Sequence, residues 1–441
     1  MSRPARIVIV GAGFAGFTAA RRLRRLSGGS AEIVVVSPTD YFLYLPLLPQ
    51  TAGGLLDPRR VAVSLAAGLP GVRFVPGEVD TVDLRLRRVG YRDWEGNRGE
   101  LGYDRLLLTI GSVHKLLPIP GVAEYAHGFR GIPEALYLRD HLIQQLQLAA
   151  VAGDPAERAA RTTFVVVGAG YTGTEVAAQG QLLTRALCRQ LPRLAGTEPR
   201  WLLIDLAPRV LPELADHLSR TATRVLTRRG VELRLETSVK EAYPGGVQLS
   251  DGEQVPTRTL VWCVGVRPDP LVESLGLPLH KGRLVVDEYL NIPGYPEAYA
   301  CGDAAAVPDL TRPGEVTPMT AQHATRQGKR AAANIAASYG RGTRKPYRHR
   351  DLGFVVDLGG LQAAANPFQI PIGGPLAAAV TAGYHLLMIP GNRLRIASDW
   401  LLGAVQPRQT VRLGLIGPGE VPLATASPET ATRAAAPSLP S

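Results

Sequence analysis

Two glycine-rich turns of the same form lie far apart in this chain, and each follows a short β-branched run and opens a helical pattern. Residues 7–10 lead into Gly11 to Gly16 (GAGFAG), and residues 164–167 lead into Gly168 to Gly173 (GAGYTG). Both fit the spacing GxGxxG, in which the first glycine makes the tight turn, the second lets a pyrophosphate approach and the third lets helix and strand pack. Two such turns predict an α/β chain that holds two dinucleotides, and the economical reason for two is electron transfer between them.

The pattern around each turn predicts a Rossmann-like unit. The first unit is expected to have a helix at 17–26, strands near 7–10, 33–36, 72–75, 82–87 and 105–110, and an apolar, aromatic loop at 40–49. A helix over 132–152 precedes the second unit, whose strands are expected at 164–167, 201–204, 231–235 and 259–264. Strand and turn chemistry returns at 284–306, where it could complete the sheet of the first unit.

Charge and cysteine content restrict the partners. The net charge of +11 favours an anionic partner, but the arginines are scattered without interleaved aromatic residues, so no nucleic acid is expected and an anionic membrane surface fits better. Cys188, Cys263 and Cys301 form no closely spaced pair, which argues against a disulfide framework, a metal site or a dithiol relay. A fingerprint strand so near the first residue leaves no room for a signal peptide, and an intracellular protein is expected.

The C-terminal part is apolar and interrupted by proline. Between Leu352 and Arg393 the only formal charge is Asp357, yet prolines leave at most about 14 residues for a helix, short of a membrane span. An apolar helix over 376–389 and an amphipathic helix over 393–405, which carries Trp400, are expected instead. A helix of this kind suits a position on a bilayer surface.

An acid at the end of the next strand would bind ribose hydroxyls and disfavour a 2′-phosphate. Asp205 follows the strand at 201–204 and favours NADH over NADPH; the alternative is that it only begins a loop. The equivalent position of the first unit is Ser37, whose hydroxyl binds ribose less strongly than a carboxylate.

Several runs together resemble the type II NADH:quinone dehydrogenases, which belong to the two-dinucleotide-binding-domain flavoproteins. They are Ser37-Pro38 with residues 41–49, the run GAGYTGTE from Gly168, ACGD ending at Asp303, and AQHATRQG from Ala321. The resemblance covers residues 5 to 415. It implies FAD on the first turn, NADH on the second, and the domains 1–115 with 284–345 (FAD), 116–283 (NADH), 346–415 (membrane surface) and 416–441 (disordered tail).

The resemblance also implies roles for single residues. Glu175 would lie near the nicotinamide, and Gln322 and Gln327 would lie on a helix where quinone docks; the alternatives are a helix-start charge and ordinary surface glutamines. Asp303 would bind the flavin's ribityl or pyrophosphate region, or cap a helix. The full set of expected cofactor-binding residues is Gly11, Gly13, Phe14, Ala15, Gly16, Ser37, Pro46, Val79, Gly111, Gly168, Gly170, Gly173, Asp205, Gly265, Gly302, Asp303 and His323.

The activity implied is non-electrogenic: NADH reduces FAD, and the flavin passes two electrons to a membrane quinone, with the protein peripheral on the cytoplasmic face. Leu361 and Gln362 stand where similar proteins often carry a lysine, which leaves the proton route open. A ferredoxin or sulfide:quinone reductase and a redox signalling protein similar to apoptosis-inducing factor remain alternatives. The residues also leave open whether the chain forms a homodimer.

Overall fold

The computed structural model describes residues 4–423, which form two compact units, each assembled from three separate stretches of the chain. The first unit contains residues 4–44, 62–113 and 266–350, and the second contains residues 45–61, 114–265 and 351–423. Both units have an α/β fold built on a sheet that is parallel except for one edge strand of the first unit, as the repeated strand–turn–helix pattern predicted.

The sheet of the first unit has six strands in the order β22-β23-β9-β1-β2-β5. The strands are β1 (Ala5–Val10), β2 (Ala31–Ser37), β5 (Arg73–Pro76), β9 (Arg105–Leu108), β22 (Asn291–Ile292) and β23 (Tyr295–Ala300). The four residues of β1 from Ile7 to Val10 are all buried, as is typical of a central parallel strand. Because β23 pairs in parallel with β9, residues from late in the chain complete the sheet that the first residues begin.

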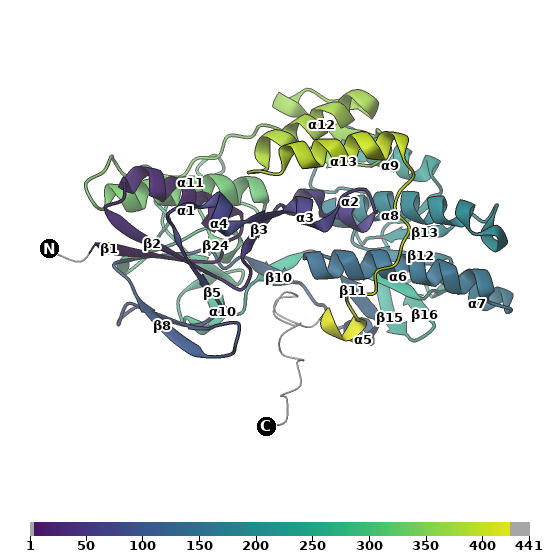
Figure 1. Cartoon of the computed structure of the whole chain (residues 1–441), viewed down its shortest axis with the longest axis horizontal. Helices are drawn as coiled ribbons and strands as arrows, with labels where there is room; N and C mark the ends of the chain where they lie inside the picture. Colours follow the sequence, from purple (N-terminus) through teal and green to yellow (C-terminus); the bar gives the residue numbers. More distant parts are fainter. Residues whose placement is uncertain (1–3, 424–441) are drawn as a thin grey trace. The chain divides into compact units, whose positions relative to one another are not determined.

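Two helices cover one face of this sheet. Helix α1 (Phe14–Ser27) packs against α11 (Ala321–Ala337), and the two lie together above the strands in Figure 1. Helix α1 ends at Gly28, which adopts a left-handed conformation that closes the last turn. The other side carries an antiparallel sheet of β6 (Glu78–Asp83), β7 (Arg88–Arg92) and β8 (Arg98–Gly102), so the expected strand at 82–87 is displaced and residues 84–87 form a turn.

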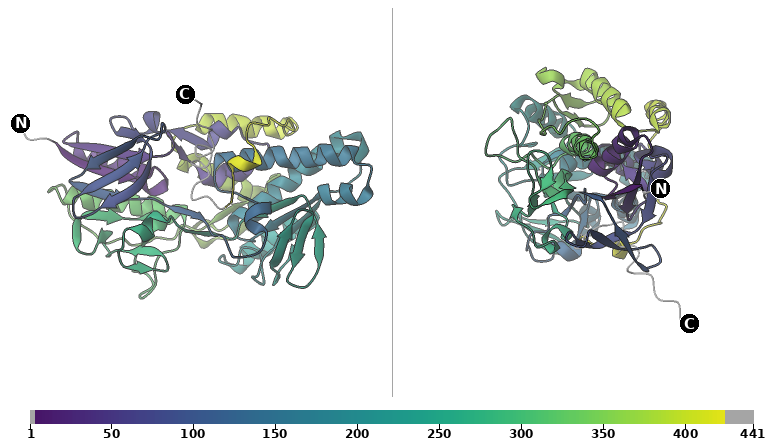
Figure 2. Two further views of the ribbon diagram at one scale, coloured as in Figure 1. Left: turned by 90° about the horizontal axis from the view of Figure 1, so that it is seen from below. Right: turned by 90° about the vertical axis from the view of Figure 1, so that its left-hand side faces the viewer.

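The sheet of the second unit has five parallel strands in the order β11-β18-β12-β13-β14. They are β11 (Ala126–Gly128), β12 (Thr163–Val167), β13 (Arg200–Ile204), β14 (Val231–Arg234) and β18 (Thr259–Trp262). Phe164, Trp201 and Trp262 are among its largest fully buried side chains. The long helices α6 (Ile132–Val151) and α8 (Tyr171–Gln190) pack against each other and lie side by side in Figure 1; Figure 2 gives two further views.

Residues 45–61 belong to the second unit and contain more helix than predicted. The chain forms η1 (Leu45–Leu47), α2 (Leu48–Ala52) and α3 (Pro58–Val61), where an irregular loop was expected over 40–49; β3 (Tyr41–Leu43) in the first unit pairs with β4 (Ala62–Ser64). Pro49 is tolerated because it stands in the first turn of α2, where its missing N–H has no partner to lose.

The C-terminal segment of the second unit has the expected helices. A small sheet of β25 (Val355–Asp357), β26 (Ala363–Ala365) and β27 (Ile372–Gly373) precedes α12 (Gly374–Met388), which packs on α13 (Arg393–Val405) (Figure 1). Within residues 4–423, none of the helices combines the length and the apolar character required to cross a bilayer.

The chain stays ordered beyond the expected start of a tail at residue 416. A short 3-10 helix, η5 (Pro418–Glu420), is followed by Val421 and Leu423, which are both buried. Leu423 joins the core that contains Val165, Leu202 and Trp262. Residues 416–423 therefore contradict the predicted disorder, and residues 424–441 lie outside the described part of the chain.

Candidate nucleotide-binding and redox sites

The first glycine turn, between β1 and α1, has one open position and two crowded ones. A Cβ atom on Gly11, whose φ is +93°, would overlap the carbonyl of Thr109, and a Cβ atom on Gly16 would overlap the carbonyl of Gly11. A Cβ atom on Gly13 would meet no protein atom within 4 Å. Gly13 is also the N-cap of α1 and carries no side-chain cap. The backbone at Gly13 is therefore free for a phosphate at the helix N-terminus.

The second turn, between β12 and α8, repeats this arrangement. A Cβ atom on Gly168 (φ +102°) would overlap the carbonyl of Cys263, and one on Gly173 would overlap the carbonyl of Gly168. Gly170, the N-cap of α8, has open space where a Cβ would stand. Both turns thus fit a pyrophosphate at the second glycine, which is a structural match for two dinucleotides.

Asp205 lies directly after β13 and reaches the second glycine turn. One carboxylate oxygen accepts a hydrogen bond from the N–H of Ala169, and the other accepts one from the N–H of Ala207 at 2.7 Å. The carboxylate is therefore fixed beside the turn, with lone pairs that remain for a ribose hydroxyl. Ser37 occupies the corresponding end of β2, is buried, and accepts a hydrogen bond from the N–H of Thr39 at 3.4 Å.

Asp303 lies in a short turn that two side chains of the first unit hold. Its Oδ2 accepts a hydrogen bond from Ser112 Oγ at 2.7 Å. The preceding N–H of Gly302 donates to Gln327 Oε1 at 2.8 Å, and Gln327 Nε2 donates to Thr317 Oγ1 at 2.9 Å. Gln327 is 1% exposed, so its amide makes its hydrogen bonds inside the unit and is not presented to solvent.

The first turns of α11 carry a polar cluster with two stacked imidazoles. Arg326 donates to Gln322 Oε1 at 3.1 Å and lies 3.3 Å from His349 Nδ1. The rings of His323 and His349 stack with centroids 3.9 Å apart, and Tyr347 Oη lies 2.9 Å from His323 Nδ1. Burial, together with the His349 ring, lowers the pKa of His323 to about 4, so this imidazole is neutral near pH 7. Gln322 is half-buried, in contrast to Gln327.

Glu175 is buried in α8, within the second unit. Its Oε1 accepts a hydrogen bond from the backbone N–H of Asp357 at 2.9 Å. Burial, and next the charge of the Asp357 side chain, raise the pKa of Glu175 well above its usual value. Three N–H groups meet the Asp357 carboxylate: Gln50 Nε2 at 2.8 Å, Gln179 Nε2 at 2.7 Å and the N–H of Gly359 at 2.9 Å.

Sequence reasoning missed this group. Asp357, Gln50 and Gln179 were not among the expected site residues, although Asp357 is the one formal charge between Leu352 and Arg393. The position of this single charge within an apolar stretch could have indicated the group, because a buried charge needs partners from elsewhere in the chain.

The remaining expected cofactor residues fall in both units. Phe14 begins α1 beside the open glycine, where its ring meets Phe42 edge-on with centroids 5.0 Å apart. Ala15 and Val79 are buried in the first unit, and Gly111 lies there with φ +85°. Pro46 in η1 and Gly265 after β18 lie in the second unit.

The three cysteines are free, and each is unsuited to thiolate chemistry. Burial raises the pKa of Cys188 to about 11 and raises the pKa of both Cys263 and Cys301 further. A reactive thiol requires the opposite shift. The redox chemistry of this chain is therefore not assigned to cysteine.

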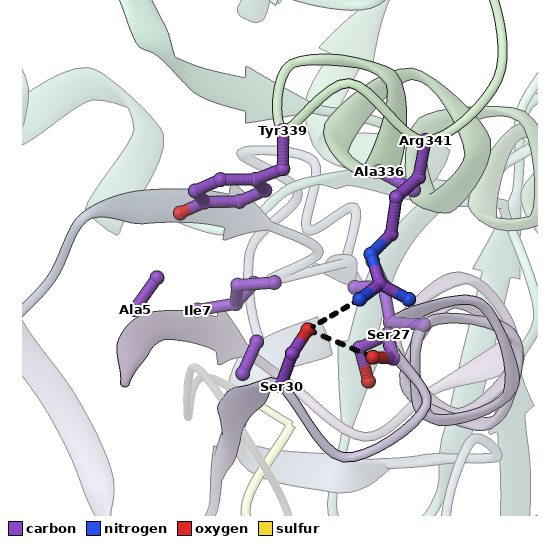
Figure 3. Close-up of a pocket in the computed structure, with 9 residues that line it drawn as sticks. Ala5, Ile7, Ser27, Ser30, Ala336, Tyr339 and Arg341 are labelled. Atoms are coloured by element: carbon purple, nitrogen blue, oxygen red, sulfur yellow. Dashed lines mark hydrogen bonds between the residues drawn. The ribbon is translucent and has the colours of Figure 1, made fainter. Parts of the chain in front are cut away.

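A cavity of about 250 Å³ in the first unit lies away from the glycine turn (Figure 3). Ala5, Ile7 and Ala31 line it, so it faces the N-terminal ends of β1 and β2, whereas Gly11 follows the C-terminal end of β1. Arg341 crosses this cavity and donates to Ser30 Oγ at 3.0 Å. Since nucleotides bind at the carboxyl ends of parallel strands, this cavity is not the expected cofactor site.

The sequence profile of the pyridine nucleotide-disulphide oxidoreductase family matches residues 5–328. The chain is 31% identical to the type II NADH:quinone oxidoreductase NdhA of Mycobacterium tuberculosis, over 90% of this chain and 86% of that protein. It is 30% identical to an internal alternative NAD(P)H-ubiquinone oxidoreductase of Solanum tuberosum mitochondria, over 92% and 88%. Its fold is similar to that of NDH2 from Plasmodium falciparum in complex with NADH, with a TM-score of 0.85, 17% identity, and coverage of 93% of this chain and all of that one.

Proposed function

Because the chain belongs to the type II NADH:quinone oxidoreductase family, we propose that it oxidises NADH and reduces a quinone, with FAD as the resident cofactor. The observation that carries this proposal is the pair of glycine turns, each with one open position at a helix N-terminus. Bound FAD would accept the hydride of NADH and release two electrons to the quinone. The residues of the protein would bind and orient FAD, NADH and the quinone.

We assign FAD to the first turn and NADH to the second. The turn at Gly13 would offer backbone N–H groups to the FAD pyrophosphate, and Ser37 and Asp303 would bind hydroxyl groups of the ribose and the ribityl chain. At the second turn, Asp205 would accept a hydrogen bond from the NADH ribose and repel the 2′-phosphate of NADPH. The two units differ at the end of the strand that follows the turn, where the first has Ser37 and the second has Asp205, and this difference supports the assignment.

Gln322 is the residue we assign to quinone binding. It is half-buried near the start of α11, where its side-chain carbonyl accepts a hydrogen bond from Arg326. A glutamine amide is the kind of group that can donate a hydrogen bond to a quinone carbonyl. Gln327 instead keeps the Gly302–Asp303 turn in place, since its carbonyl and amide groups both bind within the unit.

The faces of α12 and α13 supply the contact with the membrane that a lipid-soluble quinone requires. Leu394 on α13 is 87% exposed. Other large apolar side chains exposed on these two helices are Leu376, Leu387, Leu401, Leu402 and Val405. Exposed Arg395 on α13 adds positive charge, and such a basic group is worth about 1 kcal/mol at an anionic leaflet. We propose that the chain is peripheral and docks through this face.

The function is tested by two anaerobic half-reactions on the purified flavoprotein. Adding NADH should bleach the flavin absorbance, and adding a short-chain quinone should restore it. A flavin that NADH reduces but quinone leaves reduced would contradict quinone reductase activity and favour a signalling role.

Docking is tested by sedimentation with vesicles. The protein should bind vesicles that contain anionic lipid, and Leu394→Ser with Leu401→Ser should weaken binding about 100-fold or more, since about 2 kcal/mol of apolar burial is lost per leucine. Leu86→Ser, at a leucine that is 66% exposed in the first unit, is the matched control. Equal weakening by the control would exclude α13 as the docking face.

A further inference from the structure

The first unit buries an arginine that has no carboxylate partner. Among residues 4–423, two arginines are almost wholly buried: Arg139 is 7% exposed and Arg283 is 6% exposed. Arg139 Nε lies 3.4 Å from Asp140 Oδ1, which makes an ion pair. Arg283 forms no ion pair with any carboxylate of the described residues. A buried charge is costly unless it is paired, so the position of Arg283 needs an explanation that Arg139 does not.

The hydrogen bonds of Arg283 are also incomplete. This residue begins β21 (Arg283–Val285), and its Nη1 donates to the carbonyl oxygen of Thr317 at 2.7 Å. Its Nε is buried without a hydrogen-bond partner in the described part of the chain. A guanidinium group has five N–H donors and stays protonated in proteins. Arg283 therefore carries a full positive charge that its protein neighbours compensate only in part.

This charge belongs to the network that holds the turn of Asp303. Strand β21 pairs in parallel with β24 (Ala305–Ala306), which directly follows that turn. Thr317, whose carbonyl oxygen Arg283 binds, accepts a hydrogen bond through its hydroxyl from Gln327. Gln327 in turn accepts the N–H of Gly302. The hydrogen bonds thus run without a break from the guanidinium to the residue before Asp303.

Few other charges act on Arg283. Burial lowers its pKa, and the charge of Asp303 opposes this effect, but the two side chains do not form an ion pair. His323 is neutral near pH 7, since burial lowers its pKa to about 4. The first turn of α11, which carries His323, has no acidic side chain. Asp303 is therefore the carboxylate that offsets the charge of Arg283, and it does so from beyond contact distance.

The proposed reaction creates a negative charge on the cofactor that we assign to this unit. A hydride carries two electrons and one proton, so a neutral flavin ring that accepts it from NADH gains one negative charge, and NAD⁺ leaves. A buried cation stabilises such a charge more strongly than an exposed one, because little water screens it. Charges near a flavin ring are among the means by which a protein sets its reduction potential.

We propose that Arg283 is the buried cation that stabilises the charge gained by the flavin on reduction, and that it raises the flavin's reduction potential in this way. The Thr317 carbonyl keeps the guanidinium in place, and Asp303 limits its effect. Arg283 acts through its charge and transfers no proton. This inference rests on the proposed function, because it requires FAD at the first glycine turn.

A reductive titration of the flavoprotein with dithionite and a reference dye tests this role, since it needs bound FAD but neither NADH nor quinone. Arg283→Gln removes the charge and keeps an N–H donor. It should shift the reduction equilibrium about 10-fold or more toward oxidised flavin, which lowers the potential by about 30 mV for two electrons. Arg283→Lys keeps the charge and should retain most of the wild-type potential. An unshifted potential in Arg283→Gln, or an equal shift in Arg283→Lys, would overturn the proposal.

Arg139→Gln is the matched control, because it removes the other buried arginine, which belongs to the second unit. Its flavin potential should equal that of the wild type, and a shift as large as that of Arg283→Gln would remove the specific role of Arg283. If Arg283→Gln does not fold, Arg283→Met takes its place. Failure of both neutral variants to fold would overturn the proposal, since the protein itself and not the flavin would then require the charge.

The two half-reactions give a second readout. With reduced flavin less stable in Arg283→Gln, NADH should reduce the flavin more slowly, whereas quinone should reoxidise it at least as fast as in the wild type. Slowing of both steps would indicate a purely structural role and contradict the proposal. If the potential shifts as expected but quinone never reoxidises the wild-type flavin, the proposed function fails while the role of Arg283 stands. An unshifted potential in a protein that turns over with both substrates gives the reverse conclusion.

Discussion

The backbone N–H of Gly302 donates to the side-chain carbonyl of Gln327 at 2.8 Å, which ties the turn before Asp303 to the middle of α11. Gln327→Ala leaves this buried N–H without its partner. We expect a loss of about 1–3 kcal/mol in the free energy of unfolding and faster release of FAD. Denaturant unfolding and flavin fluorescence measure the two effects. Undiminished stability and FAD retention would show that Gln327 does not hold the turn.

Gln322→Ala tests the proposed quinone-binding role of this residue without disturbing the rest of α11. Gln322 is half-buried and contacts Arg326 on the helix surface, so its loss should change stability by less than about 0.5 kcal/mol. Flavin reoxidation by quinone should slow about 10-fold, while flavin reduction by NADH stays close to wild type. Stopped-flow measurement of each half-reaction decides this, and equal slowing of both would remove Gln322 from the quinone site.

The glycine turns predict opposite results for neighbouring alanine substitutions. Gly13→Ala adds a methyl group in open space at an ordinary φ of −69°, so the protein should fold but bind FAD weakly. Gly16→Ala forces overlap with the carbonyl of Gly11, which outweighs the roughly 1 kcal/mol that alanine adds to helix propensity, and should prevent folding of the first unit. Circular dichroism and the ratio of flavin to protein distinguish the two.

The matching pair in the second unit assigns the other nucleotide. Gly170→Ala should keep FAD and lose affinity for NADH, and Gly173→Ala should fail to fold. If Gly170→Ala loses FAD and Gly13→Ala loses NADH, the two sites are exchanged.

Asp205→Asn tests nucleotide preference with little change in shape. An asparagine amide has only one oxygen that can accept. Either the N–H of Ala169 or that of Ala207 therefore loses its acceptor, and the NADH ribose hydroxyl also loses the carboxylate that it would bind. NADH affinity should fall about 10-fold or more, since a hydrogen bond to a charged group contributes about 1.5–3 kcal/mol, and NADPH should be discriminated against less. Titration with both nucleotides measures this, with FAD content as the control for the first site. An unchanged ratio of the two affinities would contradict the role of Asp205.

Acid should destabilise the second unit through buried histidines. Burial lowers the pKa of His141 and of His385 to about 4, whereas the unfolded chain takes up protons at these residues near pH 6.5. The stability they contribute is therefore complete above pH 6.5 and is lost as the pH falls toward 4. At pH 5 the loss is about 2 kcal/mol for each histidine.

His141→Gln should flatten this dependence. Its Nε2 lies 3.0 Å from the carbonyl oxygen of Arg258, a contact that a glutamine amide can replace. The midpoint of thermal unfolding between pH 7.5 and 5 should fall less in His141→Gln than in the wild type. His280→Gln, at an exposed position in the first unit, should follow the wild type. Parallel curves for all three proteins would contradict this cause of acid lability.

Local patterns predicted the parts of the fold that depend on neighbours in sequence. The β-branched runs gave β1 and β12, and the amphipathic pattern over 393–405 matches α13 at both ends. The helical residues 45–52 and the buried Leu423 were not predicted, because proline-rich and glycine-rich stretches read as loop or tail unless their few apolar side chains find a core.

The carboxyl pair could not be predicted by pattern. Glu175 and Asp357 are 182 residues apart, and Gln50 reaches Asp357 from 307 residues away. Only the tertiary fold sets which amide end of each glutamine faces Asp357, since that depends on Trp400 and Arg408. The glycine turns, by contrast, could be predicted because six consecutive residues determine the conformation of each turn.

Each unit's composition from three stretches of chain has a consequence for synthesis. The first sheet is incomplete until β23 has been synthesised, and the core of the second unit is incomplete until Leu423, the last residue described, has been added. A nascent chain therefore carries an incomplete sheet in the first unit until β23 has left the ribosome, and an incomplete core in the second unit for longer still. Neither unit can be expressed alone as one continuous fragment, and a chain interrupted before Leu423 would emerge with an unfinished core.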